Sequence, residues 1–97
     1  MLFALICTDK PRSLDLRLAT RGAHIAYLET YQKKLVQAGP LLDPDGRPAG
    51  SLLIIDVEDA AAAAGFADSD PYNRAGLFES VVIRPYRCVF KDGELAP

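Results

Sequence analysis

The 97-residue sequence is poor in the residues that build metal centres. It has one histidine, His24, and two cysteines, Cys7 and Cys88, with no Cys-x-x-Cys pair. A structural zinc site uses four such ligands, so the sequence offers too few. Both cysteines lie in apolar, strand-like stretches, and we expect them to be buried free thiols. The sequence therefore implies no metal and no cofactor.

Long apolar runs and an excess of basic charge are also missing. The longest apolar segments, MLFALIC and SLLII, are too short to cross a bilayer, and the first has neither the basic flank nor the cleavage-like sequence of a signal peptide. Lys and Arg number 11 against 13 Asp and Glu, which gives a net charge of -2, and the basic residues are scattered. We therefore expect a cytoplasmic protein that binds neither membranes nor nucleic acid.

The apolar pattern predicts alternating strands and helices in one domain over residues 1–97, with a frayed tail at 91–97. Four segments have the composition of strands: 2–8, a short 40–42, 50–57, and 77–90, the last as one strand or two interrupted at Pro85. Two segments have helical patterns: 13–38, ended by Gly39-Pro40, and the alanine-rich 60–67.

This β-α-β-β-α-β order predicts a ferredoxin-like α+β sandwich, with two helices on one face of an antiparallel sheet. Along 50–57, however, both faces of the strand are apolar, because Leu52 and Ile54 point away from the face that Leu53 and Ile55 occupy. Two helices cover only one face, so another surface must cover the second. The simplest cover is a second copy of the chain. We therefore predict a homodimer formed through the open sheet face, pairing as a dimeric α/β barrel.

His24 lies on the apolar side of the predicted first helix. On a helical wheel, Leu35 and Ala38 fall within about 60° of it, and Arg21 and Arg17 precede it by one and two turns on the same side. A stripe that is basic at one end and apolar at the other suggests a helix that passes from a core into a cleft. A core histidine that only hydrogen-bonds a backbone carbonyl would give the same pattern.

A second candidate lies in the segment DSDPYNRAG (68–76), where we expect a break with one helical turn. Asp70 precedes Pro71, a pair typical of an N-cap and the first residue of a helical turn. Capping alone accounts for this aspartate. The two roles are compatible, because one carboxylate oxygen can accept a backbone N–H while the other orients an imidazole.

Four segments together resemble the YciI-like (YCII-related domain) family over nearly the whole chain: LFALICTDKPRSLDLRLATRGAHIAYLE, AGPL, GSLLIIDVED and ADSDPYNRAGLFESVVIRPY. Their most specific parts are R-x-x-H in the first helix and D-P-Y-x-x-A-G-L after the second. The resemblance implies a dimeric ferredoxin-like barrel whose cleft holds a His–Asp pair, here His24 and Asp70, with Ser51 at the strand edge nearby. It also implies that some members act on small aromatic ring compounds.

With such a pair, Asp70 would fix the imidazole tautomer and His24 would transfer protons near neutral pH. We therefore predict a cofactor-free lyase or isomerase that acts on a small molecule, with aromatic and enolic compounds as candidates. Candidate substrate-binding residues are Ser51 as a hydrogen-bond donor, Arg21 as an anion attractor and Tyr72 as a pocket wall. A strand-edge serine, a solvated arginine and a core tyrosine are the competing interpretations.

Two other classes of function fit the same sequence. One is a homodimer that binds a small ligand without turning it over. The other is a structural or interaction protein with a residual cleft. A pocket that reaches both the histidine and the aspartate would favour the enzyme or the binder over the structural protein.

Overall fold

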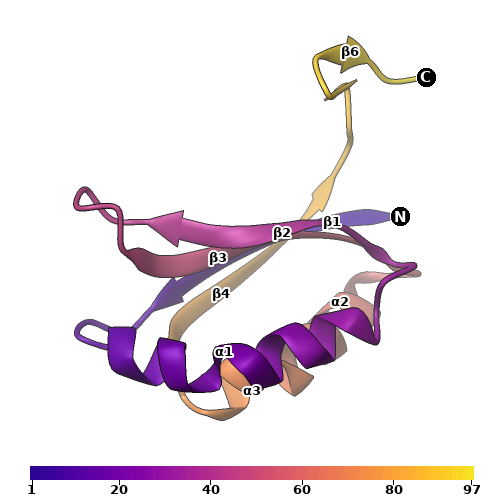
Figure 1. Cartoon of the computed structure of the whole chain (residues 1–97). Helices are drawn as coiled ribbons and strands as arrows, with labels where there is room; N and C mark the ends of the chain where they lie inside the picture. The colour runs from indigo at the N-terminus through magenta and orange to yellow at the C-terminus, as the bar shows by residue number, and fades with distance from the viewer.

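The computed structural model describes all 97 residues and has a four-stranded antiparallel sheet with its helices packed on one face (Figure 1). In chain order the elements are β1 (Leu2–Asp9), α1 (Leu14–Glu29), β2 (Leu35–Leu42), β3 (Pro48–Asp56), α2 (Ala60–Ser69), α3 (Pro71–Arg74), β4 (Phe78–Tyr86), β5 (Phe90–Lys91) and β6 (Glu94–Leu95). The strand order is β2-β3-β1-β4, and every pair is antiparallel. The predicted ferredoxin-like α+β fold is confirmed.

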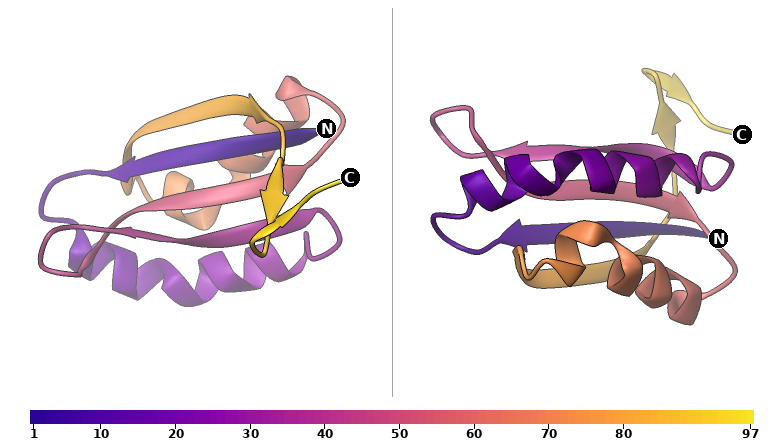
Figure 2. Two further views of the ribbon diagram at one scale, coloured as in Figure 1. Left: turned by 90° about the horizontal axis from the view of Figure 1, so that it is seen from above. Right: turned by 60° about the horizontal axis from the view of Figure 1, so that its bottom comes forward.

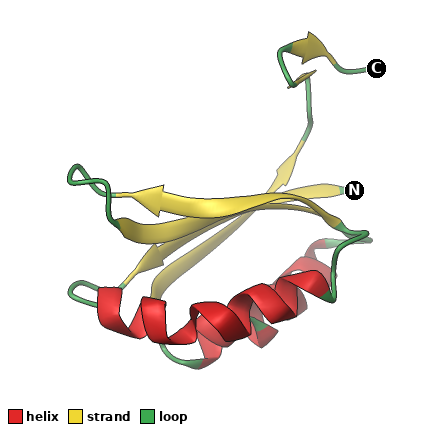
Figure 3. Cartoon of the chain, viewed as in Figure 1, coloured by secondary structure: helices red, strands yellow, loops and turns green.

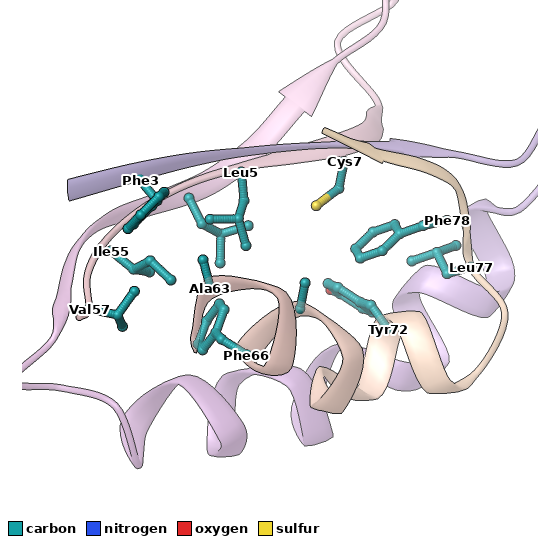
Figure 4. Close-up of a cluster of buried hydrophobic side chains, with 12 residues drawn as sticks. Phe3, Leu5, Cys7, Ile55, Val57, Ala63, Phe66, Tyr72, Leu77 and Phe78 are labelled. Atoms are coloured by element: carbon teal, nitrogen blue, oxygen red, sulfur yellow. The ribbon is translucent and has the colours of Figure 1, made fainter. Parts of the chain in front are cut away.

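The hydrophobic core lies between the sheet and the helices because alternate strand residues point to opposite faces. On β1, Phe3, Leu5 and Cys7 are almost fully buried, and Phe66 of α2 packs against the same cluster (Figure 4). Helix α1 lies over β2 and β3, while α2 and α3 lie over β1 and β4 (Figure 2). None of the three helices has the length and apolarity needed to cross a bilayer.

The other face of the sheet carries no helix (Figure 3). Leu52 and Ile54 of β3 are half-buried there, on the side opposite the fully buried Leu53 and Ile55. Val82 of β4 belongs to the same open face and is 45% exposed. The predicted two-sided apolar character of the sheet is therefore present in the fold.

The first helix is shorter than predicted. It ends at Glu29, and residues 35–42 form the edge strand β2 instead of continuing the helix to Ala38. Thr30 closes the helix by donating its Oγ1 hydroxyl to the Tyr27 carbonyl at 2.6 Å. Beyond it, pairing with β3 satisfies the backbone of β2 in a hairpin. Pro40 is tolerated there because an edge strand has one side that needs no backbone donor.

The last sheet strand runs through Pro85, which lies opposite Phe3 of β1 on the other edge of the sheet. The C-terminal segment, where the sequence predicts a frayed tail, contains a small hairpin in which Phe90 and Lys91 pair with Leu95 and Glu94. In Figure 1 this hairpin stands away from the sheet, on the side opposite the helices.

Candidate active site

A pocket of about 260 Å³ lies between α1 and the β2–β3 edge of the sheet. Both the basic and the apolar ends of the stripe on α1 contribute to it. Its walls are Arg17, Leu18, Arg21, His24, Ile25, Leu28, Ala38, Gly39, Pro40, Pro48, Ser51, Leu53 and Tyr72. Four of the five predicted site residues therefore line one pocket, and the fifth, Asp70, contacts one of them directly.

That contact is a buried hydrogen bond between His24 and Asp70. Nδ1 of the imidazole lies 2.8 Å from Oδ1 of the carboxylate. His24 is 8% exposed and Asp70 only 2% exposed, so solvent does not compete for this bond. The carboxylate holds the hydrogen on Nδ1, which leaves Nε2 without a partner in the chain.

Asp70 is positioned by its place between two helices. It ends α2 and caps the one-turn α3, in which Pro71 occupies the first position. The cap bond runs from the Tyr72 backbone N–H to Oδ1 at 2.9 Å. Capping and imidazole binding therefore use the same oxygen, whereas the sequence suggested one oxygen for each role. A carboxylate oxygen has two lone pairs, so one atom can accept both.

Tyr72 joins this pair to a second polar cluster. Its ring stacks on His24 with 4.0 Å between ring centroids and 19° between planes. The guanidinium carbon of Arg17 lies 4.6 Å from the centroid of the same ring. Burial raises the pKa of Tyr72, and the positive charges of Arg17 and Arg21 offset part of that rise. The phenol is therefore neutral at physiological pH.

The second cluster consists of Asp9, Arg17 and Ser51. Nη1 of Arg17 donates to both carboxylate oxygens of Asp9 at 3.0 and 3.1 Å, and its Nη2 donates to Ser51 Oγ at 2.6 Å. Arg17 is 4% exposed and Ser51 2% exposed. Burial raises the pKa of Asp9, and the Arg17 charge and hydrogen bonds oppose that rise.

The sequence places Arg17 on the His24 side of the helix but does not assign it or Asp9 to the site. The one signal available was positional. Asp9 continues the row of alternate β1 residues that face the core, where an aspartate requires a partner.

Two further candidates differ in their surroundings. Arg21 is exposed at the pocket and forms no ion pair, so its charge is available to an anion. Both cysteines are free: Cys88 is only half-buried, while burial raises the pKa of Cys7 to about 12. Neither lines the pocket. No three His, Cys, Asp or Glu side chains are grouped so that they could hold a metal ion.

A model of the YCII-related domain matches residues 1–87. The chain belongs to this family. It is 37% identical to the protein YciI of Escherichia coli O6:H1, with 93% of this chain and 100% of that protein aligned. It is 35% identical, at the same coverage, to an uncharacterized protein of Haemophilus influenzae.

Two solved structures resemble the fold of this YCII-related chain. The first is 5-chloro-2-hydroxyhydroquinone dehydrochlorinase (TftG) from Burkholderia phenoliruptrix AC1100, in complex with 2,5-dihydroxybenzoquinone. It superposes with a TM-score of 0.83 at 34% identity, over 90% of this chain and 94% of that one. The second, an antibiotic biosynthesis monooxygenase, has a TM-score of 0.53 at 15% identity over 91% and 100% of the two chains, and shows only that the fold is shared.

Proposed function

We propose that this protein is a cofactor-free lyase or isomerase, in which His24 transfers protons to and from a small hydroxylated ring compound. The observation that carries the proposal is the 2.8 Å bond between Nδ1 of His24 and buried Asp70, on an imidazole that also lines the pocket. Ser51, Arg21 and Tyr72 are the proposed substrate-binding residues. The similar dehydrochlorinase, which acts on a chlorinated hydroxyhydroquinone and binds a dihydroxybenzoquinone, supports a hydroxylated aromatic substrate.

The chemistry follows from which imidazole nitrogen is free. Nε2 takes a proton from an acidic O–H or C–H of the substrate, and Asp70 stabilises the resulting imidazolium. The imidazolium returns the proton to a ring carbon, which gives a keto tautomer and completes an isomerisation. If that carbon bears chlorine, His24 then takes a second proton from a ring hydroxyl, and the electron pair of that O–H bond forms a carbonyl and expels chloride. This second path is an elimination, and both paths balance without an oxidant or reductant. Positioned proton transfer of this kind contributes roughly 10²- to 10⁴-fold in rate.

The test uses 5-chloro-2-hydroxyhydroquinone as substrate and measures chloride release. We expect turnover by the wild type and a loss of about 100-fold or more in His24→Ala, the lower end of the proton-transfer range. The matched control is Asp68→Asn, an exposed aspartate two residues before Asp70, which should retain full activity. Binding of 2,5-dihydroxybenzoquinone without turnover of any halogenated ring would instead favour the ligand-binding protein.

We also propose that two copies of the chain associate through the open sheet face. That face presents half-buried Leu52 and Ile54 of β3 and exposed Val82 of β4, with half-buried Ile6 of β1 between the two strands. Contiguous apolar surface of this kind is typical of an interface. In sedimentation experiments, Ile54→Asp should convert a dimer to a monomer, whereas Leu16→Asp on the opposite, helical side should not. A wild-type chain that sediments as a monomer would refute the dimer and leave the pocket chemistry unaffected.

A further inference from the structure

Asp9, Arg17 and Ser51 come from three different elements and meet at the pocket. Asp9 ends β1, Arg17 lies in the first turns of α1, and Ser51 lies on β3 directly opposite Cys7 of β1. The side chains of Asp9 and Arg17 are only 6% and 5% exposed. Holding a full ion pair away from water is costly for a domain of this size. The position of this ion pair beside the pocket indicates that it has a role in the pocket.

The hydrogen bonds at Ser51 determine which part of its hydroxyl group is free to bind a ligand. A serine hydroxyl has one hydrogen and two lone pairs, whereas a guanidinium can only donate. The 2.6 Å bond from Arg17 Nη2 therefore occupies a lone pair of Ser51 Oγ. No side chain or backbone group of the chain accepts the hydroxyl hydrogen, and Ser51 lines the pocket. The hydrogen remains available to a bound molecule.

Arg17 also strengthens that donor. A hydroxyl whose oxygen accepts a charged donor is polarised and becomes a better donor itself. Asp9 fixes the guanidinium by accepting two bonds from Nη1, so that Nη2 is aimed at the serine. Because Asp9 balances the charge of Arg17, the arginine acts through Ser51 and not as a free cation. Arg21 supplies the uncompensated charge.

We propose that Asp9 and Arg17 are positioning residues that fix Ser51 as an obligate donor, and that this subsite selects ligands by an acceptor oxygen. Carbonyl, carboxylate, phenolate and enolate oxygens fit this requirement. Groups that only donate, such as ammonium, do not. This inference rests on the proposed ligand pocket and gives that pocket two ends, one that transfers protons at His24 and one that holds an oxygen at Ser51.

The experiment measures affinity by calorimetry with two probes, 2,5-dihydroxybenzoquinone and benzoate. Ser51→Ala should weaken at least one probe about tenfold or more, while Ser80→Ala, the same change on an exposed residue of β4, should have no effect. In Arg17→Lys, the ammonium group still provides a positive charge for Asp9. It cannot bind Asp9 and Ser51 together as the planar guanidinium does. The substitution should weaken binding to a similar extent and keep the fold, as checked by circular dichroism.

A double-mutant cycle separates positioning from a general structural role. If Arg17 acts through Ser51, adding Arg17→Lys to Ser51→Ala changes affinity by less than about twofold, because the contact is already lost. Additive losses would overturn the positioning role. Equal affinity of Ser51→Ala and wild type, or no binding of either probe to the wild type, would overturn the subsite.

These outcomes are distinct from those of the catalytic test. If the chlorinated substrate is turned over but Ser51→Ala binds both probes as tightly as the wild type, the proposed reaction is supported and the subsite is refuted. Serine-dependent binding of benzoate without any turnover would leave the subsite standing without the reaction.

Discussion

Replacing Asp70 separates its structural role from its proposed catalytic one. In Asp70→Ala, two buried donors lose their acceptor: the Tyr72 backbone N–H and the Nδ1–H of His24. A lost N-cap costs about 1 kcal/mol, and a buried donor left unpaired costs about 1–3 kcal/mol. We therefore expect the free energy of unfolding to fall by about 2–4 kcal/mol. At about 4–8 °C per kcal/mol for a domain of this size, the melting temperature should drop by about 10–30 °C.

Asp70→Asn should behave differently. The amide oxygen still caps α3, because asparagine is as good an N-cap as aspartate. The free energy of unfolding should therefore fall by about 1 kcal/mol or less, which is smaller than the loss expected for Asp70→Ala. The negative charge that stabilises the imidazolium is lost, however, and kcat/KM should fall by about 100-fold or more if His24 is the general base.

The assays are urea unfolding followed by circular dichroism, chloride release, and nitrogen NMR of the imidazole. NMR reports which ring nitrogen carries the hydrogen, and that assignment should be Nδ1 in the wild type and mixed in Asp70→Asn. Asp68→Ala serves as the exposed control and should unfold like the wild type. If Asp70→Ala also unfolds like the wild type, the two donors have another acceptor and the argument from the pair is wrong.

Four further experiments test other parts of the molecule. In Gly50→Ala the new Cβ would overlap the Cys7 carbonyl oxygen on the paired strand, and unfolding free energy should fall by about 1–3 kcal/mol in a denaturant titration. An alkylating reagent should modify half-buried Cys88 in the native protein, and Cys7 only after unfolding. The pKa of the Cys7 thiol is raised to about 12 in the folded protein. The neutral buried thiol therefore stabilises the fold fully below the unfolded thiol pKa, and this stabilisation is lost as the pH rises towards 12. Between pH 8 and pH 10, the free energy of unfolding should fall less in Cys7→Ala than in the wild type. Arg21→Gln should weaken the binding of benzoate at low salt, and the difference in affinity from the wild type should shrink as salt is added.

Strands β1 and β3 were predictable because their apolar patterns are strong. The apolar run of β1 and the two-sided apolar β3 require burial whatever their neighbours are. The contact between His24 and Asp70 was predicted through family resemblance, and the 2.8 Å bond confirms it. The residues alone left a capping aspartate and a core histidine as sufficient explanations.

The end of the first helix was not predictable from periodicity, for a specific reason. Strand β2 has an irregularity between Leu35 and Gln37, so that Leu35 lies opposite Ile55 and Ala38 opposite Leu53. Both residues therefore face the helices although they are three positions apart, which is the spacing of a helical face. The bulge therefore gives β2 the residue spacing of a continued helix, and the strand can be recognised only from its pairing with β3.

Arg17 and Asp9 were not identified as site residues from the sequence for a different reason. Arg17 near the start of a helix is typical of a solvated side chain, and nothing local marks it as 4% exposed. Its burial depends on Asp9 and Ser51, which belong to other elements. A partnership between three residues distant in sequence is set by tertiary packing, which a local pattern does not encode.

The distribution of buried polar groups links stability to function. Seventeen residues are buried, and the four that are polar or charged are Arg17, His24, Ser51 and Asp70. All four lie at or beside the same pocket, and no buried side-chain polar atom is left without a hydrogen bond. Ion pairs rarely stabilise a core more than apolar side chains of similar volume would. A domain of 97 residues has little stability in reserve. The fold therefore bears the cost of buried charge at one place only, where a ligand can reach the imidazole and the serine hydroxyl together.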